Sequence, residues 1–73
     1  MNHRLLDVVV LARDIPARGL RKGDIGTIVE VHGREAFEVE IATATGHAQA
    51  ILTLTPDDFR AAAGSDIPTV RQT

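Results

Sequence analysis

The chain has 73 residues, eight Lys and Arg against ten Asp and Glu, and a formal net charge of −2. This length indicates one domain near the lower limit for folding without disulfides or metals. There is no cysteine, which excludes disulfides and thiolate metal sites and fits a reducing compartment. Dedicated nucleic-acid modules usually carry a basic excess, and stacking platforms need more aromatics than Phe37 and Phe59.

We expect no secretory signal at the start of this sequence. Met1 to Asp7 contains a charged Arg4 and lacks the long apolar run of a secretory signal. No apolar stretch approaches the ~20 residues that span a bilayer. We therefore expect a soluble, cytoplasmic protein with no membrane contact.

The first predicted element is a strand from Leu5 to Ala12. The run is apolar, rich in β-branched residues and too short for a convincing helix. Alternation puts Val8 and Val10 on one side and Val9 and Leu11 on the other. Because both sides are apolar, the strand is either buried on both faces or part of a self-association surface.

A long irregular connection follows, over residues 13–24. Pro16 fixes its own φ and biases Ile15 toward an extended conformation, and Gly19 permits a left-handed turn. We expect Ile15 and Leu20 to hold this loop against the body of the domain. Long loops in small domains are frequent binding sites.

The same loop carries a cluster of basic side chains, which are Arg13, Arg18, Arg21 and Lys22. One interpretation is a contact patch for an acidic protein surface or for phosphate. The other is a solvated loop that Asp14 and Asp24 partly neutralise.

The next two strands are predicted to form a hairpin. Gly23 and Gly26 lead into a strand from Ile25 to His32, at positions that need φ freedom or close backbone approach. The adjacent apolar residues Ile28 and Val29 interrupt the alternation of this strand, which predicts a bend or bulge.

A tight turn at residues 33–35 leads to a third strand, from Ala36 to Ile41. Its apolar side chains alternate with Glu38 and Glu40, which indicates one buried and one solvated face.

The last third of the chain contains two further strands. A turn at residues 43–46, with Gly46 at positive φ, precedes a strand from Ala48 to Leu54 with Ile51 pointing outward. Residues 55–58, Thr-Pro-Asp-Asp, resemble a helix start with Thr as cap. They predict one helical turn, then a short strand near residues 59–62 with Phe59 in the core. The alternative is a helix that extends to Gly64.

These elements predict an all-β fold, a small SH3-like barrel of about five short strands with one helical turn before the last. A partly open sheet with a C-terminal helix shares most of the pairings. The barrel would span residues 1–63, and residues 64–73 would form a tail that is disordered in the free monomer.

Several blocks of the sequence resemble a small bacterial family that is known only as a domain of unknown function. The blocks are Leu5 to Leu11, Gly19-Leu20, Lys22 to Val31 and Leu52 to Phe59. The similarity extends from Leu5 to about Ala63. It implies an SH3-like fold and no assigned activity. Some relatives are encoded beside toxin-like proteins, which implies an antitoxin or immunity role.

The segment from Lys22 to Val31 is also similar to the KOW motif of ribosomal and transcription-elongation proteins. In that motif a glycine-containing loop and strand contact RNA or protein, and Gly23 and Gly26 fit the pattern. This sequence departs from it because three glutamates crowd the hairpin and no aromatic accompanies the basic pair. The shared glycines are equally explained by a turn geometry common to such barrels.

The sequence shows no catalytic set. The histidines lack the paired spacings of zinc sites and are expected to be solvated; they are His3, His32 and His47. Glu38 and Glu40 share a strand face, but no nucleophile or histidine is placed to work with them. Ser65 is the only serine and lies in the predicted tail.

We therefore predict no enzymatic activity, no cofactor and no metal. The favoured function is a protein-interaction module, including an antitoxin-like role, and the alternative is a KOW-like accessory protein that binds RNA or DNA. A homodimer is a separate prediction, with a self-association surface at Val9, Leu11 and Ile51.

Overall fold

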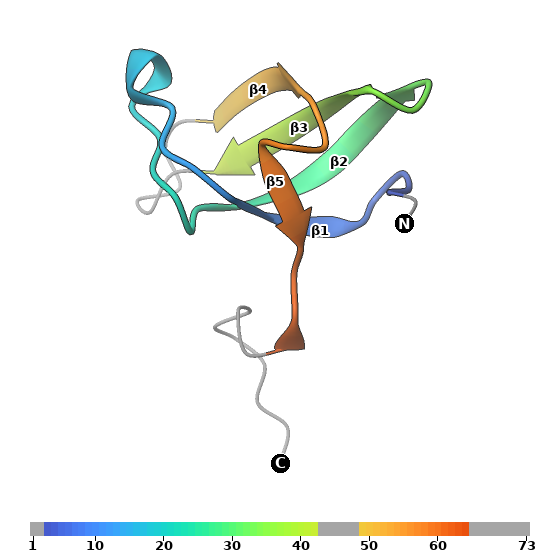
Figure 1. Ribbon diagram of the computed structural model, residues 1–73, viewed down its shortest axis with the longest axis horizontal. Coiled ribbons are helices and arrows are strands. Elements are labelled where there is room, and N and C mark those ends of the chain that lie inside the picture. Colours follow the sequence, from blue (N-terminus) through green and yellow to red (C-terminus); the bar gives the residue numbers. More distant parts are fainter. Residues whose placement is uncertain (1–2, 43–48, 65–73) are drawn as a thin grey trace.

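The computed structural model describes residues 3–42 and 49–64. Five strands form one antiparallel sheet in the order β4-β3-β2-β1-β5 (Figure 1). They are β1 (Val8–Leu11), β2 (Ile25–His32), β3 (Ala36–Ala42), β4 (Gln49–Leu54) and β5 (Phe59–Ala61). A single 3-10 turn, η1 (Pro16–Arg18), lies between β1 and β2. The all-β prediction and the presence of five strands are confirmed, but the first strand is shorter than predicted because residues 5 and 6 lie in a turn.

The hairpin of β2 and β3 contains the predicted bulge. Ile28 pairs with Val39 and Glu30 pairs with Glu38, so Val29 is the additional residue. Without it, strict alternation would put Glu30 on the same face as Ile28, inside the core. The bulge therefore keeps Glu30 outside and returns Val31 to the face of Phe37.

The two glycines before and within β2 serve the two purposes expected of them. Gly23 has φ +98°, a conformation that L side chains rarely adopt. Gly26 is buried, and a Cβ there would lie 2.8 Å from Val39 Cγ1 and 2.9 Å from the Glu40 carbonyl oxygen. The approach of β2 to β3 thus requires glycine at position 26.

The sheet curls around one core. The rings of Phe37 on β3 and Phe59 on β5 meet edge to face, with their centroids 5.6 Å apart. Three strand spacings of about 4.8 Å would separate these strands in a flat sheet, so the sheet must bend to bring them together. Figure 1 shows β5 running steeply across the direction of β2 and β3. The strand number and curl agree with an SH3-like barrel. In the part of the chain that the structure describes, the barrel is not closed by strand pairing, because β4 and β5 are the two edges of the sheet and do not pair with each other.

The residues of the core come from all five strands and from the loop after β1. They are Val9, Leu11, Leu20, Ile28, Phe37, Val39, Ile41, Leu52, Leu54 and Phe59. The predicted self-association surface is therefore wrong at two of its three positions. Val9 and Leu11 are each 1% exposed and belong to this core, because the curl of the sheet covers the face of β1 that they occupy. Ile51 is exposed, as predicted.

Three short turns share one hydrogen-bond arrangement, and each is followed directly by a strand. An aspartate N–H donates to the carbonyl three residues earlier at 2.9–3.0 Å, and its carboxylate accepts that residue's N–H at 2.9 Å. The pairs are Arg4 and Asp7 before β1, Arg21 and Asp24 before β2, and Thr55 and Asp58 before β5. Local side-chain hydrogen bonds of this kind are typical of Asp in turns.

The third of these turns corrects the prediction of a helix start. Residues 55–58 form a single hydrogen-bonded turn and not a helix. Thr55 does not cap with its side-chain oxygen; its N–H and hydroxyl both donate to the Asp58 carboxylate, at 2.9 Å and 3.2 Å. Since β5 starts at Phe59, the chain re-enters the sheet before a helix can propagate. The alternative helix at 61–63 does not form, because β5 includes Ala61. The predicted turn at 43–46 and the tail beyond Gly64 lie outside the described residues.

Candidate functional site

Backbone hydrogen bonds within the basic loop between β1 and β2 determine its conformation. Ile15 and Leu20 exchange two hydrogen bonds, of 2.9 Å and 3.1 Å, across η1. Gly19 ends η1 in the left-handed conformation, with φ 71°. Leu20 is buried and Ile15 packs against the core, so the prediction that these two residues hold the loop is confirmed.

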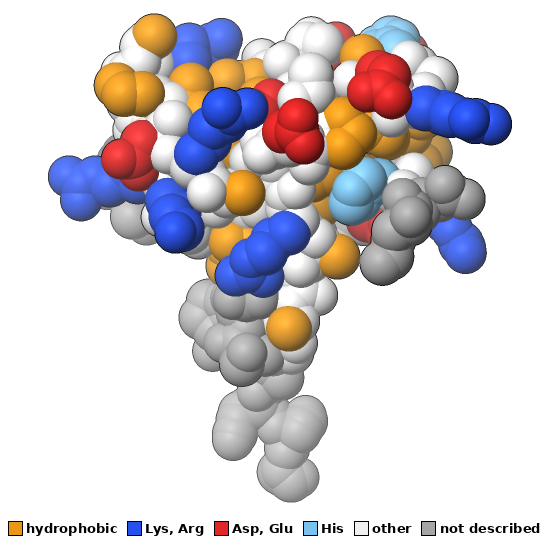
Figure 2. All heavy atoms as spheres, viewed as in Figure 1, with side chains coloured by type: hydrophobic (Ala, Val, Ile, Leu, Met, Phe, Trp, Pro, Cys, Tyr) orange, Lys and Arg blue, Asp and Glu red, His pale blue; other side chains and the backbone are white. Residues whose placement is uncertain are grey.

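The four predicted contact cations are exposed, and they differ in their partners. Arg13 donates from Nε to Asp58 Oδ1 at 2.8 Å and forms an ion pair with it. Within residues 3–42 and 49–64, the side chains of Arg18, Arg21 and Lys22 form no ion pair. Figure 2 shows Lys and Arg side chains gathered toward the side of the molecule that carries this loop.

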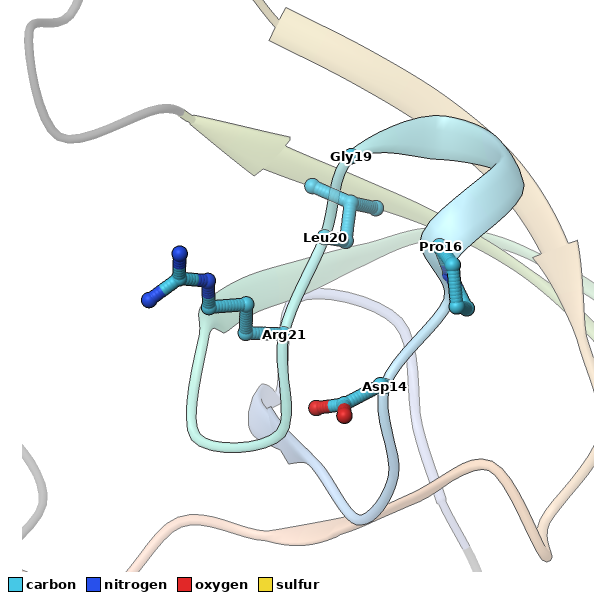
Figure 3. A pocket seen from close by; sticks show the side chains of 5 residues that line it. All are labelled: Asp14, Pro16, Gly19, Leu20 and Arg21. Carbon is cyan, nitrogen blue, oxygen red and sulfur yellow. The ribbon is translucent and has the colours of Figure 1, made fainter.

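The aspartates of the loop occupy backbone donors that an anion would need. Asp14 Oδ1 accepts the N–H of Lys22 at 2.8 Å, and Asp24 Oδ2 accepts the N–H of Arg21 at 2.9 Å. An open hollow of about 300 Å³ lies beside them, lined by Asp14, Pro16, Gly19, Leu20 and Arg21 (Figure 3). Only one cationic side chain contributes to its lining, and the Arg21 guanidinium points away from Asp14 (Figure 3). An anion at this loop would therefore meet cationic side chains but not the N–H groups of Arg21 and Lys22.

Asp58 links the loop to the turn before β5. Burial raises the pKa of this carboxyl, but hydrogen bonds from the Thr55 N–H, from Arg13 and from the Thr55 hydroxyl, with the charge of Arg13, outweigh it. The net effect is a pKa below the ordinary value for Asp. The pair has a structural role because it fastens two loops at one end of the sheet.

A second surface lies on the outward side of β2, β3 and β4. The register aligns Thr27 with Glu40 and Glu40 with Ile51 in one row, and Glu30 with Glu38 and Glu38 with Thr53 in the next. We call this surface the acidic face; it comprises Thr27, Glu30, Glu38, Glu40, Ile51 and Thr53. The three strands that build it contain no Lys or Arg. Ile51 is 55% exposed in its row.

One carboxylate of the acidic face has local partners. Thr53 Oγ1 donates to Glu38 Oε2 at 2.8 Å, and His32 Nε2 lies 3.4 Å from the same oxygen. Glu30 is directly opposite Glu38 across the β2–β3 ladder. These contacts orient Glu38 over β4, and the face as a whole stays negatively charged.

Two further apolar side chains are exposed in the turn before β1. Leu5 is 55% and Leu6 69% exposed, and Leu6 has φ 73°. Positive φ is costly for a leucine because its Cβ crowds the following carbonyl. The sequence pattern missed this pair, because both residues continue the apolar run of β1 and no local signal separates them from it.

The histidines do not assemble a metal site within the described residues, where no group of three or more His, Cys, Asp or Glu is arranged to hold an ion. His3 corrects the prediction of a solvated residue. Its ring centroid lies 5.5 Å from that of Phe37 and 4.7 Å from that of Phe59, so it packs on the end of the core. His32 is exposed beside Glu38, and His47 lies outside the described residues.

None of the helices in the described part of the chain is long and apolar enough to cross a membrane.

Comparison with known proteins provides a family and no function. No curated protein and no solved structure shows a significant match to the chain. The family described as "Domain of unknown function (DUF4926)" matches residues 5–61, which include every strand of the sheet. The chain therefore belongs to the DUF4926 family, in agreement with the resemblance drawn from its sequence blocks.

Proposed function

We propose that this protein is a non-enzymatic protein-interaction module that receives a basic partner protein on the acidic face. The observation that carries the proposal is the exposure of Ile51, which shares a row with Glu40 and lies next to the row of Glu30 and Glu38. An exposed apolar residue beside charges of one sign has the composition of an interface centre with a polar rim.

The physical contributions of these residues differ. Because Ile51 is 55% exposed, its burial in an interface would contribute about half of the ~1.5–3 kcal/mol of a fully exposed isoleucine, and we take it as the anchor. The carboxylates increase the association rate with a basic partner and disfavour acidic ones. Glu38 is already oriented by Thr53, so less side-chain freedom is lost when it pairs with a cation.

The class of partner is suggested by the family resemblance. Some relatives are encoded beside toxin-like proteins, which suggests that the partner is a protein of this kind. A small module that covers a basic surface of such a partner would act as an antitoxin or immunity protein. Nucleic acid is a less suitable ligand for this face, because three carboxylates repel phosphate. The basic loop offers little compensation, since Asp14 and Asp24 accept the N–H groups of Lys22 and Arg21.

Affinity capture from cells that encode the protein tests this proposal. The bait variants are the wild type, Ile51→Lys and Leu5→Lys. Leu5 is as exposed as Ile51 but lies in the turn before β1, so it is the matched control for adding a lysine at an exposed apolar site. We expect a basic protein that binds the wild type and Leu5→Lys and is lost with Ile51→Lys. Equal capture by all three baits, or none, contradicts the proposal.

A further inference from the structure

The two edges of the sheet differ in their protection. β5 is three residues long and carries Arg60, and short, charged edge strands resist pairing with other chains. β4 has six residues, Gln-Ala-Ile-Leu-Thr-Leu, with no charge and no proline. Its register with β3 continues without a bulge over six pairs. β4 therefore lacks the usual devices that block strand addition, and in the described residues its outer side has no partner strand.

We propose that the partner binds by adding an extended segment to the outer edge of β4, in which Lys or Arg alternates with apolar residues. This inference rests on the proposed function and names the mode and chemistry of binding at the same face. Main-chain hydrogen bonds to the edge supply affinity in this mode, and alternate side chains supply specificity.

The charge distribution around β4 determines which residues the segment carries. Side chains on the outward side of the added segment would lie beside Ile51 and Thr53. From there, long basic side chains can reach across β4 toward Glu38 and Glu40. Side chains on the inward side of the segment would extend the two rows that contain Leu52 and Leu54, which are buried, so apolar residues suit these positions. The pattern follows from the alternation of a strand between two faces.

A second copy of this chain is a poorer occupant. Antiparallel pairing of β4 with another β4 would put a second Glu38 and Glu40 on the same side of the joined sheet. Like charges there disfavour the dimer, whereas a basic segment neutralises them.

The test uses a displayed library of random twelve-residue peptides, selected against the full chain. We expect the selected peptides to alternate basic with β-branched or other apolar residues. The best peptide is then synthesised with N-methyl groups on one set of alternate amides or on the other. Only one edge of an added strand bonds to β4, so one analogue should bind about tenfold or more weakly and the other like the parent.

Amide hydrogen exchange locates the bound peptide. On addition of the parent peptide, alternate amides of β4 should exchange about tenfold or more slowly, and Ile51→Lys should abolish this protection while Leu5→Lys retains it. The inference is overturned by selected sequences without alternation, by equal binding of both N-methylated analogues, or by protection elsewhere. It is also overturned if β4 becomes protected without peptide as protein concentration rises, since the occupant is then a second copy. A captured partner that depends on Ile51 but leaves β4 exchange unchanged retains the proposed function and rejects strand addition.

Discussion

The Asp58 carboxylate accepts a hydrogen bond from the backbone N–H of Thr55 at 2.9 Å, and the backbone N–H of Asp58 donates to the Thr55 carbonyl at 2.9 Å. The same carboxylate accepts Arg13 from the loop after β1. Loss of this group therefore opens a turn and an inter-loop contact together. We expect Asp58→Ala to lower the free energy of unfolding by about 1–2 kcal/mol, as for loss of a capping aspartate, in urea denaturation at pH 7. Asp57→Asn changes the adjacent exposed residue and should have no measurable effect.

The contribution of Asp58 should depend on pH. Its pKa in the folded protein lies below the ordinary value, so the stabilisation is complete above the unfolded pKa and is lost as pH falls through the folded one. The difference in free energy of unfolding between wild type and Asp58→Asn should therefore shrink below about pH 4. Urea titrations from pH 7 to pH 2.5 measure it. A difference that stays constant over this range contradicts the role of the ionised carboxylate.

Gly26 is the glycine whose replacement should cost most. An added Cβ would contact the Glu40 carbonyl and the side chains of Val39 and Ile41 at less than 3.0 Å, and overpacking of this kind costs about 1–3 kcal/mol. Gly23→Ala meets open space but has φ +98°, so about 1 kcal/mol is expected. Gly64→Ala, with open space and no positive φ, is the control. Thermal unfolding of the three variants should rank them in this order.

Leu6 offers a substitution that stabilises. Asn tolerates the left-handed conformation far better than Leu, and Leu6 is largely exposed with φ 73°. We expect Leu6→Asn to raise stability by about 0.5–1 kcal/mol, which corresponds to a rise of a few degrees in Tm for a domain of this size. Leu5→Asn lacks the positive φ and should not raise Tm. An unchanged or lower Tm for Leu6→Asn would show that the side chain contributes contacts that exceed the backbone cost.

Binding of RNA by the basic loop is the main competing function, and a titration tests it directly. With mixed RNA at ~50 mM salt, where phosphate contacts are strongest, we expect no saturable binding, because the loop aspartates occupy the amides of Arg21 and Lys22. Fluorescence anisotropy measures this. Saturable binding that weakens in the double variant Arg21→Ala, Lys22→Ala would favour the nucleic-acid function over the proposed one.

Local patterns in the sequence were sufficient to predict most of the secondary structure. The alternation of Phe37, Val39 and Ile41 with glutamates specifies which face of β3 is buried, and the adjacent Ile28 and Val29 indicate the bulge. Gly19 adopts the expected left-handed conformation, although the 3-10 turn η1 that it ends was not predicted. These predictions succeed because φ preferences and the period of two are properties of neighbouring residues. The prediction of a helix start at residues 55–58 is wrong for the same reason, since a Thr-Pro-Asp-Asp segment can begin a helix or close a turn.

What the sequence by itself determined is the alternation along each strand, and with it the outward direction of Ile51, Glu38 and Glu40. Only the tertiary structure decided which strands lie side by side beyond the predicted hairpin of β2 and β3, how far the sheet curls, and therefore that Val9 and Leu11 are covered while Ile51 is not. Strand register and curl depend on contacts between residues far apart in the chain, such as Phe37 with Phe59 and Gly26 with Val39. No local pattern encodes those contacts. The acidic face exists only because the strand register aligns its glutamates with Ile51 and Thr53.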